Sequence, residues 1–146
     1  MDLHKKLKQY EHFIDQKLKP DLKDIESTLA KKSMECKEWI DLKTVVGIIC
    51  EFKDTDRDMN VQLPLGNDVT TFAKICDYES TYVNVGLGCI LEMDREEASK
   101  YADIRLRLLQ KEINHLRKLA VNVKVHIKMV LLAISELQAT LVNNIK

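Results

Sequence analysis

The last third of the chain carries a regular pattern of apolar positions. They are spaced alternately four and three residues apart, which is the heptad spacing of a coiled coil. This spacing places every such side chain on one stripe of one long helix, and an isolated helix cannot shield that stripe from water. The pattern therefore predicts a partner helix. The coiled-coil positions are Leu109, Ile113, Leu116, Ala120, Val123, Ile127, Val130, Ile134, Leu137 and Leu141.

The long helix is expected to start at Asp94 and to end at about Asn143. Asp94 is followed three residues later by Glu97, a variant of the capping box, and acids in the first turn suit the helix dipole. A helix of ~50 residues would be about 75 Å long.

The first third also has helical periodicity, although it is less regular. The steps from Ile14 to Leu18 to Leu22 are two consecutive fours, which locally unwind a supercoil, and Pro20 lies inside this interval. We expect a kink between Lys17 and Pro20. The stripe comprises Leu3, Leu7, Tyr10, Ile14, Leu18, Leu22, Ile25 and Leu29, and continues through Cys36, Trp39 and Val46, with Lys32 and Lys43 at seam positions that should pair more loosely.

The middle of the chain has the period-two alternation of β-strands. Apolar residues alternate from Met59 to Leu65, and the turn-like Gly66-Asn67-Asp68 leads into a β-branched run that starts at Val69. A second hairpin is predicted around Gly86-Leu87-Gly88. Pro64 cannot donate to a ladder, so it belongs at an edge or a strand end.

These hairpins are predicted to pair with other chains. Two short hairpins with no helix packed across them bury too little apolar surface, and the faces around Val83, Val85 and Ile90 should be exposed. The predicted assembly residues are Val61, Leu63, Phe72, Val83, Val85, Gly86, Gly88 and Ile90.

The pattern as a whole predicts a mainly α protein with a small β region, in which two long antiparallel coiled-coil helices are joined by two β-hairpins. A single domain is expected over residues 1–146, with arms at 1–50 and 94–146 and hairpins at 51–93. The 146 residues are 45% hydrophobic and 32% charged, a soluble, helix-rich profile. The longest apolar run, from Met129 to Ile134, is far below the ~20 residues of a membrane span, so an intracellular, soluble protein is expected.

Catalytic and metal-binding motifs are missing from the sequence. The four cysteines form no CxxC pair, which favours free thiols in a reducing compartment and argues against zinc. The Gly86-x-Gly88 pair lacks the third glycine of a dinucleotide fingerprint, and the acids that follow would repel a phosphate. We therefore expect no enzyme activity, no cofactor and no metal.

The net charge is zero but unevenly distributed, since residues 95–146 hold ten basic and five acidic residues. A basic run in this helix contains only one acid, Glu112. It is either a solvated face beside the seam or a surface for an acidic partner or nucleic acid. Direct nucleic-acid binding is not expected of a neutral protein. The run comprises Arg105, Arg107, Lys111, Arg117, Lys118, Lys124 and Lys128.

Two helical arms around two hairpins resemble an α-type prefoldin subunit. The stretch from Tyr82 to Asp94 is similar to the strand-glycine-x-glycine-strand signature of that family, which ends in Glu92, and the match extends into Glu97-Ala98. Pro20 departs from the family pattern. Segments that resemble one branch of the family are Tyr10 to Ile14, Asp21-Leu22, Asn122 to Met129 and Glu136 to Gln138.

The resemblance implies a heterohexamer of two α-type and four β-type subunits, in which hairpins form a shared β-barrel and coiled coils hold unfolded client proteins without ATP. For this branch it further implies RuvB-like ATPases and transcription regulators as partners, with cytoplasmic and nuclear localisation and a link to the centrosome. The alternatives are a nuclear scaffold or transcription cofactor that acts through coiled-coil contacts, and a homodimeric coiled coil. Client and partner contacts are expected at the arm ends, at Leu3, Leu7, Tyr10, Phe13, Leu141, Val142 and Ile145.

Overall fold

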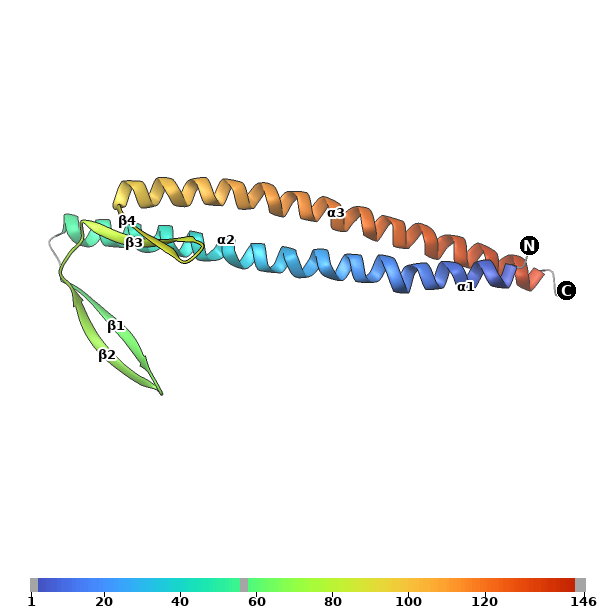
Figure 1. The fold of residues 1–146 in the computed structure, drawn as a ribbon, viewed down its shortest axis with the longest axis horizontal. Helices are drawn as coiled ribbons and strands as arrows, with labels where there is room; N and C mark the ends of the chain where they lie inside the picture. The colour runs from blue at the N-terminus through green and yellow to red at the C-terminus, as the bar shows by residue number, and fades with distance from the viewer. Residues whose placement is uncertain (1–2, 56–57, 144–146) are drawn as a thin grey trace. The chain divides into compact units, whose positions relative to one another are not determined.

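The computed structural model describes residues 3–55 and 58–143. Its helices are α1 (Leu3–Phe13), the π-helix η1 (Ile14–Leu18), α2 (Lys19–Asp54) and α3 (Arg95–Asn143) (Figure 1). Its strands are β1 (Met59–Gly66), β2 (Val69–Ile75), β3 (Ser80–Gly86) and β4 (Cys89–Asp94). The predicted fold class, mainly helical with a small antiparallel β part, is confirmed.

The chain forms two compact units. The helical unit comprises Met1–Met34 and Leu109–Lys146, and the hairpin unit comprises Glu35–Leu108. The single domain with boundaries near residues 50 and 94 stays a prediction.

The helical unit supplies the partner helix that the heptad pattern requires. Ile14 and Leu18 pack with Ile134 in one buried cluster, and α1 lies beside the C-terminal end of α3 (Figure 1). From Leu109 to Leu141, the ten heptad positions are buried or half-buried, and every other position except Ala133 is exposed. Burial in α3 therefore has the heptad period, and the pairing in this unit lies within one chain.

Ion pairs flank this seam and show that the helices run antiparallel. Lys32 Nζ lies 2.9 Å from Glu112 Oε2, and Lys124 Nζ lies 2.9 Å from Glu26 Oε1. The lower-numbered residue of α2 thus pairs with the higher-numbered residue of α3, which is the order of antiparallel helices. Lys32, which occupies a seam position, is matched by an acid from the facing helix.

The structure has a π-helical turn at Ile14–Leu18, next to the interval from Lys17 to Pro20 where a kink is expected. The N–H of Lys19 donates to the carbonyl of Ile14, five residues earlier. Proline has no N–H to donate and crowds the preceding turn, so a widened turn just before it relieves that conflict. Because a π-helical turn contains more residues than an α-helical turn, two consecutive steps of four residues can stay on one stripe. Ile14 and Leu18 are accordingly both buried.

Tyr10 is a correction to the predicted stripe of the first arm. Its side chain is 39% exposed, whereas Leu7 packs against the buried cluster. The extra residue in the π-helical turn changes the phase of α1 relative to α2. A constant heptad step therefore assigns Tyr10 to the wrong position.

Both hairpins are antiparallel and turn in the same way. β1 pairs with β2 and β3 with β4, each as a separate two-stranded sheet. The register shifts between Pro64 and Gly66 in the first hairpin and between Asn84 and Gly86 in the second. A bulge therefore precedes each turn, and Pro64 lies beside the bulge on an edge strand, as expected.

The second turn contains a strained leucine. Leu87 has φ 53° between Gly86 and Gly88, which also have positive φ, and its side chain is completely exposed. A positive φ is costly for leucine because Cβ crowds the backbone, whereas asparagine tolerates it.

We expect Leu87→Asn to raise the free energy of unfolding by up to about 1 kcal/mol. Thermal melts of the full chain would measure this gain. Cys89→Asn, in the adjacent strand, is the control and should give no gain. A lower melting temperature for Leu87→Asn would show that the side chain itself makes a stabilising contact.

The second hairpin packs on the helices of its own unit, which corrects the expectation that no helix covers the hairpins. Val83 is 3% exposed and clusters with Val46 of α2 and Ala98 of α3. Strand alternation sends Val83 and the half-buried Val85 toward the helices. The expectation of an exposed face at Val83 is therefore wrong, and only its backbone edge is open to another chain.

The start of α3 has the predicted reciprocal cap. The N–H of Glu97 donates to Asp94 Oδ1 at 2.7 Å, and the N–H of Asp94 donates to Glu97 Oε2 at 3.1 Å. Two backbone donors without helical partners are satisfied in this way. The cap fixes the point where β4 ends and the helix begins.

Candidate functional site

Every strand of the two hairpins has a free edge. In a two-stranded sheet each strand is hydrogen-bonded on one side only, so a row of backbone N–H and C=O groups is open to a strand from another chain. Isolated hairpins of this size are marginally stable in water. The geometry therefore suits completion of the sheets by other subunits.

The first hairpin has apolar groups on both faces. Val61 pairs with Ala73 and Leu63 with Thr71 on one face, while Phe72, opposite Gln62, is 80% exposed on the other. Val61 is half-buried and Leu63 is exposed. The Asp58 carboxylate lies 2.7 Å from Lys74 Nζ, and this hydrogen-bonded ion pair raises the pKa of the Lys74 ammonium.

The second hairpin presents a different face to solvent. Ile90 is opposite Asn84 and Tyr82 is opposite Glu92, and both Ile90 and Tyr82 are more than 60% exposed. Gly86 and Gly88 lie in the turn, where the N–H of Gly86 donates to Asn84 Oδ1 at 2.9 Å. Of the predicted assembly residues, all but Val83 and the half-buried Val61 and Val85 are exposed.

An aromatic and charged cluster of the helices α2 and α3 lies beside β3. The Trp39 and Tyr101 rings meet edge to face at 5.5 Å, and the Arg105 guanidinium lies 5.7 Å from the Trp39 ring. Arg105 Nη2 also donates to Glu35 Oε1 at 2.6 Å. A groove of about 370 Å³ runs between this cluster and β3. Arg105, one arginine of the basic run, is therefore half-buried and paired within the hairpin unit.

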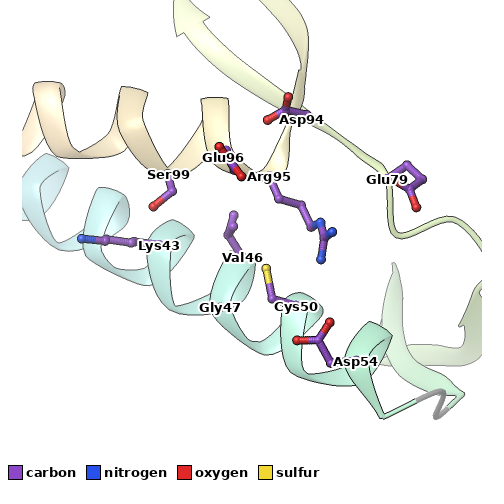
Figure 2. A pocket seen from close by; sticks show the side chains of 10 residues that line it. All are labelled: Lys43, Val46, Gly47, Cys50, Asp54, Glu79, Asp94, Arg95, Glu96 and Ser99. Atoms are coloured by element: carbon purple, nitrogen blue, oxygen red, sulfur yellow. The ribbon is translucent and has the colours of Figure 1, made fainter.

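A larger cavity of about 650 Å³ lies where α2 ends and α3 begins (Figure 2). The Arg95 side chain extends toward Cys50 and Asp54, and Gly47 leaves room because it has no side chain. The lining mixes carboxylates, cations and one thiol. Over residues 3–55 and 58–143, no three His, Cys, Asp or Glu side chains are grouped so that they could hold a metal.

The predicted arm-end residues differ in exposure. Tyr10, Phe13 and Val142 are exposed, whereas Leu3, Leu7 and Leu141 are half-buried. Ile145 lies outside the described residues. All the described members belong to the helical unit, and Tyr10 and Phe13 are adjacent on α1, one turn apart. The structure therefore gathers apolar surface on α1 and at the end of α3.

Helix α3 is more apolar than its seam requires. An 18-residue window has a mean hydropathy of 1.5, and by length and composition alone this helix could cross a membrane. Only 6% of the window is buried within the chain. One such helix is weak evidence for a span, and the low burial shows that much of its apolar surface is exposed within the chain.

Packing between the hairpin and the helices was missed at the level of sequence. The residue of α3 that meets the hairpin is Ala98, which is completely buried against Val83 and Val46. Small side chains on one face allow another element to approach closely. Leu42, which packs in the same cluster, was hidden because Lys43 occupies the heptad position beside it.

Comparisons with known proteins identify similar chains. The model of the prefoldin subunit family matches residues 18–140. The UXT homolog of Nematostella vectensis is 28% identical over 137 residues, which cover 94% of this chain and 86% of that protein. Human UXT is 32% identical over 133 residues, which cover 91% of this chain and 83% of that protein. A solved chain of filamentous PFD from Methanocaldococcus jannaschii is 20% identical, with a TM-score of 0.44 and coverage of 93% of this chain and 98% of that one.

Proposed function

Because the chain belongs to the prefoldin subunit family and is similar to UXT over most of its length, we propose that it is a non-catalytic subunit of a prefoldin-like co-chaperone. In this proposal it assembles with β-type subunits and a second α-type subunit, and the complex holds unfolded or assembling client proteins without ATP. We further propose a cytoplasmic and nuclear location, with the centrosome as an additional site and RuvB-like ATPases and transcription regulators as further partners.

Assembly is supported by the two hairpins. Their free edges and exposed side chains, such as Phe72 and Ile90, are features of sheets that are completed by another chain. Three basic side chains of the hairpin unit, those of Lys43, Lys53 and Arg105, form ion pairs with acids of the same unit. Their charges are therefore already matched without an acid from another subunit.

Client binding is supported by one observation above all, the exposed apolar residues Tyr10, Phe13 and Val142 of the helical unit. Their side chains are offered to solvent on helices whose seam is already paired. Exposed apolar groups bind unfolded chains through the hydrophobic effect and without sequence preference, which is what an ATP-independent holdase requires.

The test replaces these residues with serine and measures how well the assembled complex prevents a chemically denatured protein from aggregating, without ATP. The triple variant Tyr10→Ser, Phe13→Ser, Val142→Ser should lose most of the suppression, because all three are exposed and their loss should leave the seam packed. Light scattering at fixed molar ratios would measure the effect.

A matched control exists on α2. Met34, Val45 and Ile48 are 65%, 46% and 39% exposed, against 61%, 47% and 39% for Val142, Phe13 and Tyr10. Serine at these three positions removes a similar apolar area and should leave suppression intact. Equal suppression by both triple variants would place client binding elsewhere than at the arm ends.

A further inference from the structure

Helix α3 has a second apolar stripe opposite its heptad seam. At 3.6 residues per turn, four apolar side chains fall within a sector of about 80° whose centre is about 180° from the centre of the seam. Their side chains are between 50% and 63% exposed. This outer stripe consists of Val121, Val125, Met129 and Leu132.

The outer stripe faces away from the helix that pairs with α3 in the helical unit. The helical unit pairs α3 through the seam, where Ile134 meets Ile14 and Leu18, and the opposite side of a helix cannot contact that same partner. Contiguous apolar surface of this kind marks a place where another molecule binds. Its position, in the middle of α3, also separates it from the exposed Val142 at the arm end.

The charges around the outer stripe have one sign. Residues 113–135 contain four basic residues and no Asp or Glu. Lys124 is engaged by Glu26, but Arg117, Lys118 and Lys128 have no ion pair or hydrogen bond with any residue in the described part of the chain. On the same helical projection Lys118 lies inside the sector of the outer stripe, whereas Lys128 and Arg117 flank it, about 20° and about 40° beyond Val121.

We propose that the outer stripe is a docking site for an amphipathic helix of a partner protein that carries Asp and Glu beside its apolar positions. Apolar residues three and four apart are the anchors with which one helix receives another. Acids beside the partner's apolar row would pair with Arg117, Lys118 and Lys128, whereas a basic helix would be repelled by them.

An anionic membrane offers similar chemistry, but the outer stripe suits a helix better. It is narrower than the apolar face of about 100° or more by which a helix rests on other surfaces. It also contains no Trp, Phe or Tyr, the side chains that anchor helices at a lipid interface. The surface therefore matches a partner of helical width.

The proposal can be tested with two synthetic helical peptides of equal length. Both carry leucine at the a and d positions, and one has glutamate and the other lysine at e and g, so that like charges keep each peptide from pairing with itself. Fluorescence anisotropy would measure binding to the full chain together with the subunits that copurify with it. The glutamate peptide should bind at least about tenfold more tightly than the lysine peptide, and high salt should reduce that preference.

Two sets of variants assign the binding to the outer stripe. Val125→Gln with Met129→Gln should weaken binding of the glutamate peptide by about tenfold or more. The control is Ile40→Gln with Met34→Gln on α2, where exposures of 50% and 65% match the 50% and 63% of the first pair. Lys118→Glu with Lys128→Glu should reverse the preference toward the lysine peptide, while Lys31→Glu on α2 should not.

Several results would overturn the proposal. Equal affinity for the two peptides, or equal loss of binding in the outer-stripe pair and its α2 control, would exclude an acidic helix at this surface. Vesicles that contain phosphatidylserine provide the other arm: binding to them, lost in Val125→Gln with Met129→Gln, without binding to either peptide, would assign the surface to a membrane. Circular dichroism of each variant verifies that the helices remain folded.

Discussion

Ile134→Asp is expected to lower the free energy of unfolding by about 3–5 kcal/mol, the largest stability effect of any single substitution considered for this chain. Ile134 is 8% exposed and packs against Ile14 and Leu18 across the seam. The aspartate loses these contacts and buries a carboxylate among the apolar side chains of the cluster. Urea or thermal unfolding followed by circular dichroism would measure the change.

The neighbouring position provides the control. Ser135 is exposed, and its hydroxyl donates to the carbonyl of Leu132 in its own helix. Ser135→Asp should therefore change the free energy of unfolding by less than about 1 kcal/mol. If the two variants melt at the same temperature, the seam contributes little to stability.

Val61→Lys is expected to prevent the chain from assembling with partner subunits, with a loss of association of about a hundredfold or more. Val61 is half-buried on the apolar face of β1, opposite Ala73, and a lysine there would place a charge within a sheet that another chain must cover. Copurification and analytical ultracentrifugation of coexpressed subunits would measure assembly. The helical circular dichroism signal should not change.

Gln62→Lys is the matched control, because Gln62 is next in sequence, exposed, and points to the opposite face, beside Phe72. It adds the same charge to the same strand. Assembly should persist in this variant. Identical behaviour of Val61→Lys and Gln62→Lys would mean that the apolar face of β1 is not the contact surface.

The elements governed by local periodicity could be predicted from the sequence. The seam from Leu109 to Leu141 has a strict heptad period over many turns, and a helix translates that period directly into burial. The turns at Gly66 and Gly86 and the cap at Asp94 also depend on a few adjacent residues. Their chemistry is local, so no tertiary information was needed.

Contacts between distant segments could not be predicted in the same way. Val83 packs on Val46 and Ala98, and no periodicity relates a strand to the helix face on which it lies. The sequence predicts a kink between Lys17 and Pro20 and not the π-helical turn, because two consecutive steps of four are compatible with either. Tyr10 was misassigned for this reason.

The two binding surfaces differ in how far the sequence reveals them. The exposed edges of the hairpins follow from strand length and spacing. The outer stripe is obscured because Val121, Val125 and Met129 lie between seam residues, so the two stripes together read as one apolar segment. Only the burial of the seam separates them.

The ion pairs beside the seam of the helical unit bear on how the chain finds its alignment during folding. An aliphatic heptad repeat looks almost the same after a slip of seven residues, so burial alone separates neighbouring alignments poorly. After such a slip Lys32 would face Arg105 or Leu119 in place of Glu112, and Glu26 would face Arg117 or Leu131 in place of Lys124. Exposed pairs contribute only about 0–1 kcal/mol each to the native state, but the slipped states lack one or both of them. The charges thus disfavour pairings of the two helices that are shifted by seven residues. This effect on alignment during folding is separate from the small contribution that the pairs make to the melting temperature.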